Sequence, residues 1–267
     1  MDRGPRPHNK SNTFVILNKK DYKQKLDLIL DDRLKFKKIS KDPTAQLKID
    51  VNERIHAANE DLPAKLLNPI IGEYSPGYIY GTVKTHKLGN PSRPIISQIP
   101  TPTHNIAKQL NNLINPYLPG KYIINSTDEF LTILRSTIPD GIIASLDVES
   151  LFTNVPVLDT IDIICQAVYH HEKLPPLPFE KNILKKLLVS CTTKAPFKHI
   201  DESLFLQIDG VAMGSALGVT CANFYMGHIE NKVLSDIPIK PKKYYRYVDD
   251  CYIVVEDIRQ LYTMPDS

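Results

Sequence analysis

The sequence predicts an α+β fold, in which helices pack against mainly antiparallel strands. Three observations indicate this class. Strand-like apolar runs alternate with segments whose apolar residues have helical spacing, and turn signals join several of the strand-like runs directly into hairpins. The 267 residues are 42% hydrophobic and 24% charged, which is the composition of an ordinary globular domain.

The first third of the chain is expected to begin irregularly and then form a strand, a helix and an extended region. Residues 1–12 are polar and predicted to lack regular structure, and residues 12–19 resemble a short strand. Residues 21–36 have the spacing of an amphipathic helix with a lysine-rich face. That face is either solvated or a contact for a nucleic-acid backbone. Residues 70–98 are rich in Pro and Gly, which predicts extended segments divided by turns.

The rest of the chain alternates helical and strand-like patterns. Ser126 opens a capping-box spacing, with Glu129 three residues later, which predicts a helix N-terminus. The closing segment reads as a hairpin whose turn is Val248-Asp249-Asp250. The other expected elements are, in order, a helix at 105–113, a buried strand at 141–148, helices in 159–171 and 179–191, a hairpin in 197–208, a glycine loop at 209–218 and a helix at 219–234.

Charge, cysteine content and hydropathy limit the class of protein. The net charge is only +3, so any nucleic-acid-binding surface must be local rather than a property of the whole chain. The four cysteines include no C-x-x-C pair and are expected to be isolated, buried thiols in a reducing compartment. The chain has no apolar N-terminal leader and no run of about 18 apolar residues, so we expect an intracellular, soluble protein without a membrane partner.

Three aspartates follow or separate strand-like runs. Asp147 ends one such run, and Asp249 and Asp250 lie between two others roughly a hundred residues later. If these strands are neighbours, the carboxylates meet at one end of a sheet, where a cation would offset their repulsion. Oxygen ligands of this kind suit Mg²⁺, and two such ions about 4 Å apart support phosphoryl transfer. Taken alone, an Asp-Asp pair in a hairpin turn is more typical of turn chemistry than of catalysis.

Cations and glycines accompany these carboxylates. Lys84, Lys87 and Arg93 lie on an extended pair divided by a Gly/Pro turn, and such a flap can place several cations on a triphosphate. Gly210 and Gly214 permit close backbone approach to a base pair and allow a hinge. Solvated loop residues and an ordinary helix-entry loop are the alternatives for these two groups.

Four motifs occur in the order found in reverse transcriptases: RPI, LDVESLFTNVP, GVAMGS and YVDD. LFTNVP, the THK that precedes RPI, and QIDGVAMGS resemble specifically the reverse transcriptases of Penelope-like retroelements. The resemblance extends from about Phe14 to Val255. It implies a right-hand polymerase with fingers and a palm, in which an antiparallel catalytic sheet packs on helices.

The resemblance also implies roles for the carboxylates. Asp147 matches the first metal-binding aspartate, and the carbonyl of Val148 helps to hold a metal. Asp249 matches the second essential aspartate, and Asp250 matches its supporting neighbour. The implied cofactor is a pair of Mg²⁺ ions, for which Mn²⁺ can substitute.

For the nucleotide, the resemblance implies a second group of contacts. Arg93 matches the fingers arginine that contacts the incoming triphosphate, and the matching lysine is either Lys84 or Lys87. Phe152 stands where reverse transcriptases carry an aromatic gate against the ribose 2′-hydroxyl, although simple core packing also explains an aromatic residue there. Gly214 is expected in the part of the glycine loop nearest the dNTP.

The implied organisation is an N-terminal extension with fingers helices in residues 1–75, the flap-bearing fingers in 76–140 and a palm in 141–267. Family members continue beyond the catalytic hairpin with further palm elements and a thumb, so we expect a palm that is incomplete at its C-terminus.

The implied function is RNA-directed DNA synthesis, with an RNA template, a DNA primer and dNTPs as partners. The alternative is a truncated element remnant that is catalytically inactive and binds nucleic acid weakly at most. A nuclear location is implied by the resemblance alone.

Overall fold

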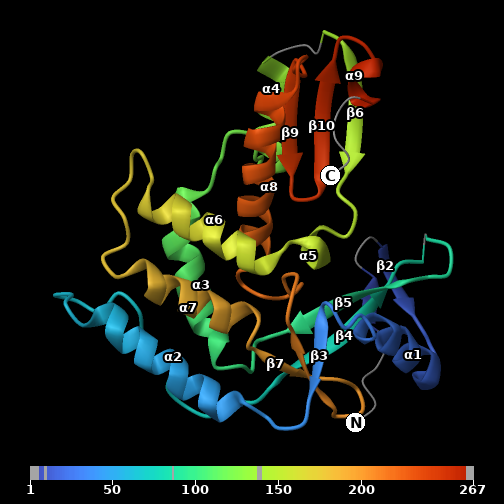
Figure 1. Cartoon of the computed structure of the whole chain (residues 1–267). Coiled ribbons are helices and arrows are strands. Elements are labelled where there is room, and N and C mark those ends of the chain that lie inside the picture. The colour runs from blue at the N-terminus through green and yellow to red at the C-terminus, as the bar shows by residue number, and fades with distance from the viewer. Residues whose placement is uncertain (1–5, 9–10, 86, 137–139, 263–267) are drawn as a thin grey trace.

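We describe the fold from a computed structural model, in which residues 6–8, 11–85, 87–136 and 140–262 are described (Figure 1). The N-terminal half contains β1 (Arg6–His8), β2 (Ser11–Val15), α1 (Lys19–Leu30), β3 (Phe36–Ile39), α2 (Thr44–Asn59), β4 (Gly77–Val83), β5 (Ser92–Ser97), α3 (Thr103–Ile114), the 3₁₀ turn η1 (Asn115–Tyr117) and α4 (Thr127–Ser136). The C-terminal half contains β6 (Ile142–Asp147), α5 (Leu151–Asn154), α6 (Val157–Tyr169), α7 (Lys181–Thr192), β7 (Pro196–Lys198), β8 (Leu204–Gln207), α8 (Gly218–Asp236), β9 (Lys243–Tyr247), β10 (Asp250–Val255) and α9 (Arg259–Tyr262).

The N-terminal elements differ from the sequence predictions in two respects. Within residues 1–12, predicted to be irregular, the described part forms β1 and the start of β2, which pair antiparallel. The first helix ends at Leu30 rather than near residue 36. Asp32 ends it, because its side chain accepts a hydrogen bond from the amide of Leu34 and its carbonyl accepts one from the amide of Phe36. The chain thereby turns into β3.

Residues 44–59 form a long helix, α2, for which the sequence analysis made no prediction. The predicted cap of α4 is confirmed: the Ser126 hydroxyl accepts a hydrogen bond from the amide of Glu129 at 3.1 Å. The Glu129 carboxylate in turn accepts from the amide of Asn125 at 2.8 Å. These two contacts satisfy amides that would otherwise lack partners at the start of the helix.

Two main sheets organise the molecule. The five-stranded sheet has the order β3-β8-β7-β4-β5, and all its pairs are antiparallel except β4 with β7. The three-stranded sheet β6-β10-β9 is entirely antiparallel and lies at the other end of the molecule (Figure 1). Both sheets pack on helices, so the predicted α+β class is confirmed.

The main hydrophobic core is helical. Its buried residues come chiefly from α2, α3, α6, α7 and α8, which gather on one side of the molecule in Figure 1. Helix α8 extends from this core along the three-stranded sheet (Figure 1). A small separate cluster of Cys251, Ile253 and Val255 fills the space under β10. The helices thus form the scaffold on which the three-stranded sheet is mounted.

Strand β6 was expected to be buried, and that prediction is wrong. Ile142, Ile143 and Leu146 are 41%, 57% and 41% exposed. The strand forms the edge of its sheet, and no strand within the described residues pairs with its outer side. An apolar run indicates a tendency to be buried, but the strand is buried only where another element covers it.

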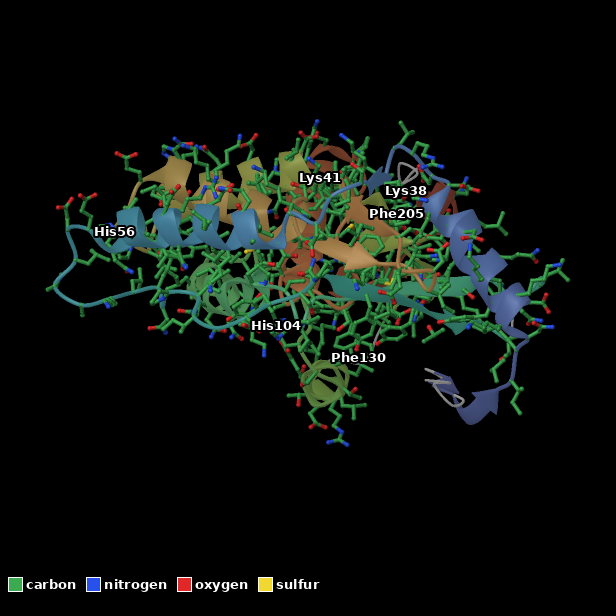
Figure 2. All side chains as sticks on the ribbon, turned by 90° about the horizontal axis from the view of Figure 1, so that it is seen from below. Lys38, Lys41, His56, His104, Phe130 and Phe205 are labelled. Carbon is green, nitrogen blue, oxygen red and sulfur yellow. The ribbon has the colours of Figure 1, made fainter. Side chains whose placement is uncertain are left out.

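The five-stranded sheet joins segments that are distant in sequence. Strands β7 and β8 belong to the region predicted as palm, yet β7 pairs with β4 of the predicted fingers. At the edge of this sheet formed by β3, the ammonium of Lys38 lies 5.9 Å from the ring centroid of Phe205 on the neighbouring strand β8 (Figure 2). The division into 1–75, 76–140 and 141–267 therefore stays a prediction, and these strands connect its parts.

Among the described helices, none is both long and apolar enough to cross a membrane. All four cysteines are buried and unpaired, as the sequence predicts. Burial raises the pKa of Cys165 to about 11 and that of Cys221 to about 12, so both remain thiols at neutral pH.

Candidate functional site

The three aspartates lie together at one end of the three-stranded sheet. Strand β10 pairs antiparallel with β6 so that Asp250 is directly opposite Asp147. The amide of Val148 donates a hydrogen bond to the carbonyl of Asp249 at 2.9 Å, which continues the pairing past the end of the ladder. Asp147 and Asp250 are exposed and Asp249 is half-buried. The fold therefore brings together carboxylates that are roughly a hundred residues apart in sequence.

A tight turn presents Asp249. Tyr247 pairs with Asp250, which leaves only Val248 and Asp249 between the strands. Val248 has a φ of +55°, a left-handed conformation that is unfavourable for a β-branched residue and is common for glycine. Such strained residues persist where surrounding contacts hold them, and they concentrate at functional sites.

One cation of the flap, Lys84, interacts electrostatically with these carboxylates. Arg93 on β5 is paired with Thr82 on β4, and Lys84 follows directly after β4. Lys84 is half-buried, and burial lowers its pKa, as do the nearby charges of Arg93 and Lys87. Asp147 and Asp249 act on the same pKa in the opposite direction. Lys84 therefore lies within electrostatic range of both the flap cations and the carboxylates, whereas the side chain of Lys87 is exposed.

Helix α1 supports this flap from outside. The Lys25 ammonium donates hydrogen bonds to the carbonyls of Gly89 and Asn90 at 3.2 and 2.8 Å. The Tyr22 hydroxyl accepts from the amide of Gly81 at 2.7 Å. One helix thus holds the flap at its tip and within strand β4.

Three lysines of the predicted basic face have partners within the protein. Lys25 holds the flap, Lys23 forms ion pairs with Asp27 and Asp201, and the Lys35 ammonium donates to Asn154. Structural contacts therefore account for part of the lysine-rich pattern. The alternatives of a solvated face and of a nucleic-acid contact stay open for the rest.

The glycine loop is seated between α5 and β5. A Cβ on Gly210 would lie 2.8 Å from the carbonyl oxygen of Thr153, and one on Gly214 would lie 2.7 Å from that of Ile96. Both glycines have positive φ, of 71° and 113°. Close approach within the protein itself therefore requires glycine at both positions, a reason that the sequence did not reveal. Contact of Gly214 with a nucleotide stays a prediction.

Phe152 lies beside this loop. Its carbonyl accepts a hydrogen bond from the amide of Val211 at 2.7 Å, and its ring is 3.8 Å from the position of a Cβ built on Gly218. The side chain is half-buried and packs against the main core. Phe152 thus contributes to the core while part of it remains accessible, and both sequence interpretations stay open.

The donor atoms at the carboxylate end of the sheet are of the type that Mg²⁺ prefers. Within the part of the chain that the structure describes, no group of three or more His, Cys, Asp or Glu side chains is arranged to hold a metal ion by itself. Mg²⁺ in nucleotide sites normally takes one or two protein carboxylates and completes its octahedron with water and phosphate oxygens. A site of this open kind at Asp147 and Asp249 stays a prediction.

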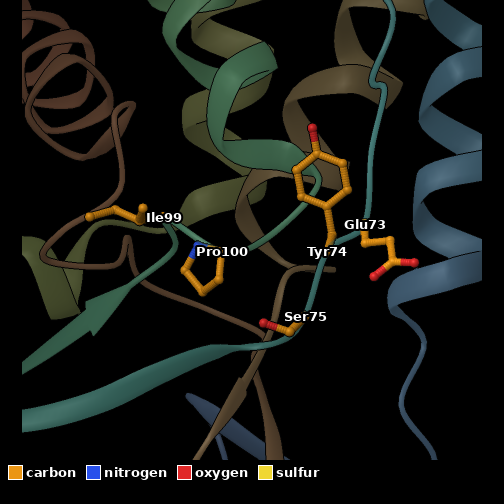
Figure 3. Close-up of a pocket in the computed structure, with 5 residues that line it drawn as sticks. All are labelled: Glu73, Tyr74, Ser75, Ile99 and Pro100. Carbon is orange, nitrogen blue, oxygen red and sulfur yellow. The ribbon is translucent and has the colours of Figure 1, made fainter.

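Two pockets lie elsewhere in the described part of the chain. One of about 410 Å³ is lined by Glu73, Tyr74, Ser75, Ile99 and Pro100, where the chain enters β4 and leaves β5 (Figure 3). Another, of about 360 Å³, lies on the α3 side of Tyr74. None of the predicted site residues lines either pocket, so neither is assigned to the site.

Sequence reasoning missed Arg246, which is fully buried on β9, the first strand of the carboxylate hairpin β9–β10 that carries Asp249 and Asp250. A charged residue within the β-prone run YYRYVDD was the available signal, since an arginine in such a strand is buried only when it is paired.

Comparisons with known proteins identify a family and a fold. Residues 85–266 match the family described as reverse transcriptase (RNA-dependent DNA polymerase). The fold is similar to that of apo telomerase from Candida tropicalis truncated from its C-terminal domain, with a TM-score of 0.56 at 12% identity, covering 96% of this chain and 53% of that one. Telomerase from Candida albicans, solved with the TWJ fragment of telomeric RNA, gives a TM-score of 0.57 at 11% identity, covering 97% of this chain and 46% of that one.

The chain thus spans about half the length of these telomerases, and at such low identity the similarity shows the fold alone. No curated protein matches the sequence significantly.

Proposed function

Because the chain belongs to the reverse transcriptase (RNA-dependent DNA polymerase) family, we propose that it carries the fingers and catalytic palm of an RNA-directed DNA polymerase. The reaction is attack of a primer 3′-hydroxyl on the α-phosphate of a dNTP opposite an RNA template. The observation that supports it best is the pairing of Asp147 with Asp250 across β6 and β10, with Lys84 within electrostatic range.

In this proposal Asp147 and Asp249 are the metal ligands, the Val148 carbonyl assists them, and Asp250 supports the site from the neighbouring position. Two bound Mg²⁺ ions, or Mn²⁺ in their place, would lower the pKa of the primer hydroxyl and offset charge on the leaving oxygen. The carboxylates contribute by fixing the place where primer and triphosphate meet. Asp147 is exposed and Asp249 only half-buried, which leaves both accessible to the substrates.

Arg93 and a flap lysine would bind the triphosphate, and Lys84 is the better candidate for that lysine. Lys84 is half-buried and within range of both Asp147 and Asp249, whereas Lys87 is exposed on the loop. A triphosphate between flap and carboxylates would contact Lys84 first. Phe152, on the short helix that follows Asp147, would then exclude the ribose 2′-hydroxyl, and Gly214 would lie under the nucleotide.

Within the family, we assign the chain to the Penelope-like retroelements. The support is the sequence itself, namely LFTNVP after the first aspartate, THK before RPI, and QIDGVAMGS.

Primer extension on an RNA template tests the proposed reaction. Wild-type protein should extend a DNA primer with dNTPs in Mg²⁺ or Mn²⁺, and Asp249→Asn should reduce extension by about a hundredfold or more because a ligand charge is lost. Asp159→Asn, which changes an exposed aspartate on α6, is the matched control and should extend normally. Wild-type protein without extension at high concentration would contradict the proposal and leave weak nucleic-acid binding as the alternative.

A further inference from the structure

A buried ion pair joins strand β9 of the carboxylate hairpin to helix α8. Arg246 of β9 is 0% exposed and Glu230 of α8 is 4% exposed. The guanidinium donates from Nε and Nη2 to the two carboxylate oxygens of Glu230, and the Nη2 contact is 3.3 Å long. The Tyr244 hydroxyl donates to Glu230 Oε1 at 2.9 Å. The glutamate is therefore hydrogen-bonded on both oxygens, as a buried carboxylate requires.

The remaining arm of the guanidinium reaches the turn. Arg246 Nη1 donates to the carbonyl of Val248 at 2.9 Å and to Asn223 Oδ1 at 2.9 Å. Val248 is the residue with φ of +55°, and it directly precedes Asp249. One side chain thus connects helix α8 to the strained peptide that presents the carboxylate.

The main chain of Arg246 is fixed as well. Its amide donates to the carbonyl of Tyr122, and its carbonyl accepts from the amide of Ile124, both at 2.8 Å. The Arg246 side chain therefore extends from a fixed backbone to three partners, Glu230, Asn223 and the Val248 carbonyl. Small displacements of the turn are opposed because each of these bonds would have to lengthen.

Stability alone does not explain a buried pair of this kind. Removing two charges from water is costly, and apolar residues of similar size commonly give equal or greater stability. A role that an apolar pair cannot perform is donation to the Val248 carbonyl, because no apolar side chain carries a donor.

We propose that Arg246 is a positioning residue for the carboxylate site. Held by Glu230, its guanidinium fixes the Val248 carbonyl, maintains the left-handed turn and thereby keeps Asp249 beside Asp147. The inference rests on the proposed role of these aspartates as metal ligands. Partners that orient metal ligands typically contribute 10- to 100-fold to metal affinity.

The test is the double variant Arg246→Met/Glu230→Met, which replaces the ion pair with unbranched apolar side chains. We expect a folded protein whose thermal midpoint is close to that of the wild type. Its affinity for Mn²⁺, measured by electron paramagnetic resonance, should fall by about tenfold or more. A folded double variant that binds Mn²⁺ as tightly as the wild type would overturn the proposal.

A second readout does not depend on metal. The Val148 amide bonds to the Asp249 carbonyl, so its hydrogen exchange reports on the position of the turn. In the double variant this amide should exchange at least about tenfold faster, while the Ile164 amide in the core helix α6 keeps its protection. Unchanged exchange at Val148 would equally contradict the proposal.

Controls separate this inference from the proposed function. Lys185→Met/Asp162→Met removes an ion pair between α7 and α6, far from the hairpin in sequence, and should change neither readout. If Asp249→Asn leaves Mn²⁺ binding unchanged, the assignment of Asp249 as a metal ligand is wrong. Hydrogen exchange at the Val148 amide then still decides whether Arg246 holds the turn.

If the double variant does not fold, Arg246→Lys replaces it in both measurements. Lysine keeps the charge beside Glu230 but lacks the planar fork that contacts three partners at once. Faster exchange at Val148 is then the expected result, and wild-type exchange would refute the role.

Discussion

Two hairpins supply the opposite charges of the candidate site, and they are held in different ways. The flap β4–β5 is supported from outside by Lys25 and Tyr22 of α1. The carboxylate hairpin β9–β10 is held from inside by the fully buried Arg246. The hydrogen bonds of Lys25 are exposed and contribute little, whereas the buried charge-assisted bonds of Arg246 to Glu230 are strong. The comparison suggests a carboxylate hairpin with a fixed position and a flap that can move.

The largest expected effect is on the stability of the protein when the Arg246–Glu230 ion pair is broken. Glu230→Ala leaves the Arg246 guanidinium buried without its partner, which should destabilise the protein by about 3–5 kcal/mol. Chemical denaturation measures this change as a lower midpoint. Glu53→Ala, at an exposed position of α2, is the matched control and should have a small effect. A Glu230→Ala protein of wild-type stability would show that the hairpin does not depend on its buried support.

The two flap lysines, Lys84 and Lys87, should differ in their effect on the KM for dNTP. Lys84→Met is expected to raise the KM for dNTP by about tenfold, because a charge-assisted contact to the triphosphate is lost. Lys87→Met should change the KM little, since that side chain is exposed. Steady-state kinetics of primer extension gives both values. The opposite ranking would assign the flap role to Lys87.

Phe152 lies between the two hairpins in chain order and next to the glycine loop. Phe152→Ala should admit ribonucleotides about tenfold better relative to deoxynucleotides, because a smaller side chain leaves room for the 2′-hydroxyl. Single-nucleotide incorporation with matched dNTP and rNTP measures the ratio. An active variant with unchanged sugar selectivity would leave core packing as the role of the ring.

The outer support of the flap should have the smallest effect. Lys25→Met removes two exposed hydrogen bonds to the flap tip and should raise the KM for dNTP by about threefold, with kcat nearly unchanged. Lys20→Met changes a lysine on the same helix and serves as the control. A loss comparable to that of Lys84→Met would mean that the flap is as firmly held as the carboxylate hairpin.

Local patterns predicted the elements well, for physical reasons. Helices α3, α6, α7 and α8 bury apolar residues at intervals of three and four, and this spacing is visible in the sequence. The turn between β7 and β8 was also anticipated, and Glu202 has the positive φ that a tight turn requires. The reverse transcriptase family, inferred from four ordered motifs, is confirmed over residues 85–266.

Features that depend on distant contacts were not predicted. The exposure of β6 depends on whether another element covers it, and the pairing of β7 with β4 joins segments more than a hundred residues apart. The role of Arg246 depends on Glu230 in another element. For the site, the sequence named the carboxylates and cations, and the structure adds the register that places Asp147 opposite Asp250.

The central claim is that Asp147 and Asp249 belong to one site, and a double-mutant cycle tests it most directly. Primer extension should be measured for the wild type, Asp147→Asn, Asp249→Asn and the double variant. Residues that act as a unit are strongly non-additive. We therefore predict that the double variant is about as inactive as either single variant, each having lost about a hundredfold or more. Single variants that retain activity, or losses that multiply in the double variant, would contradict the account.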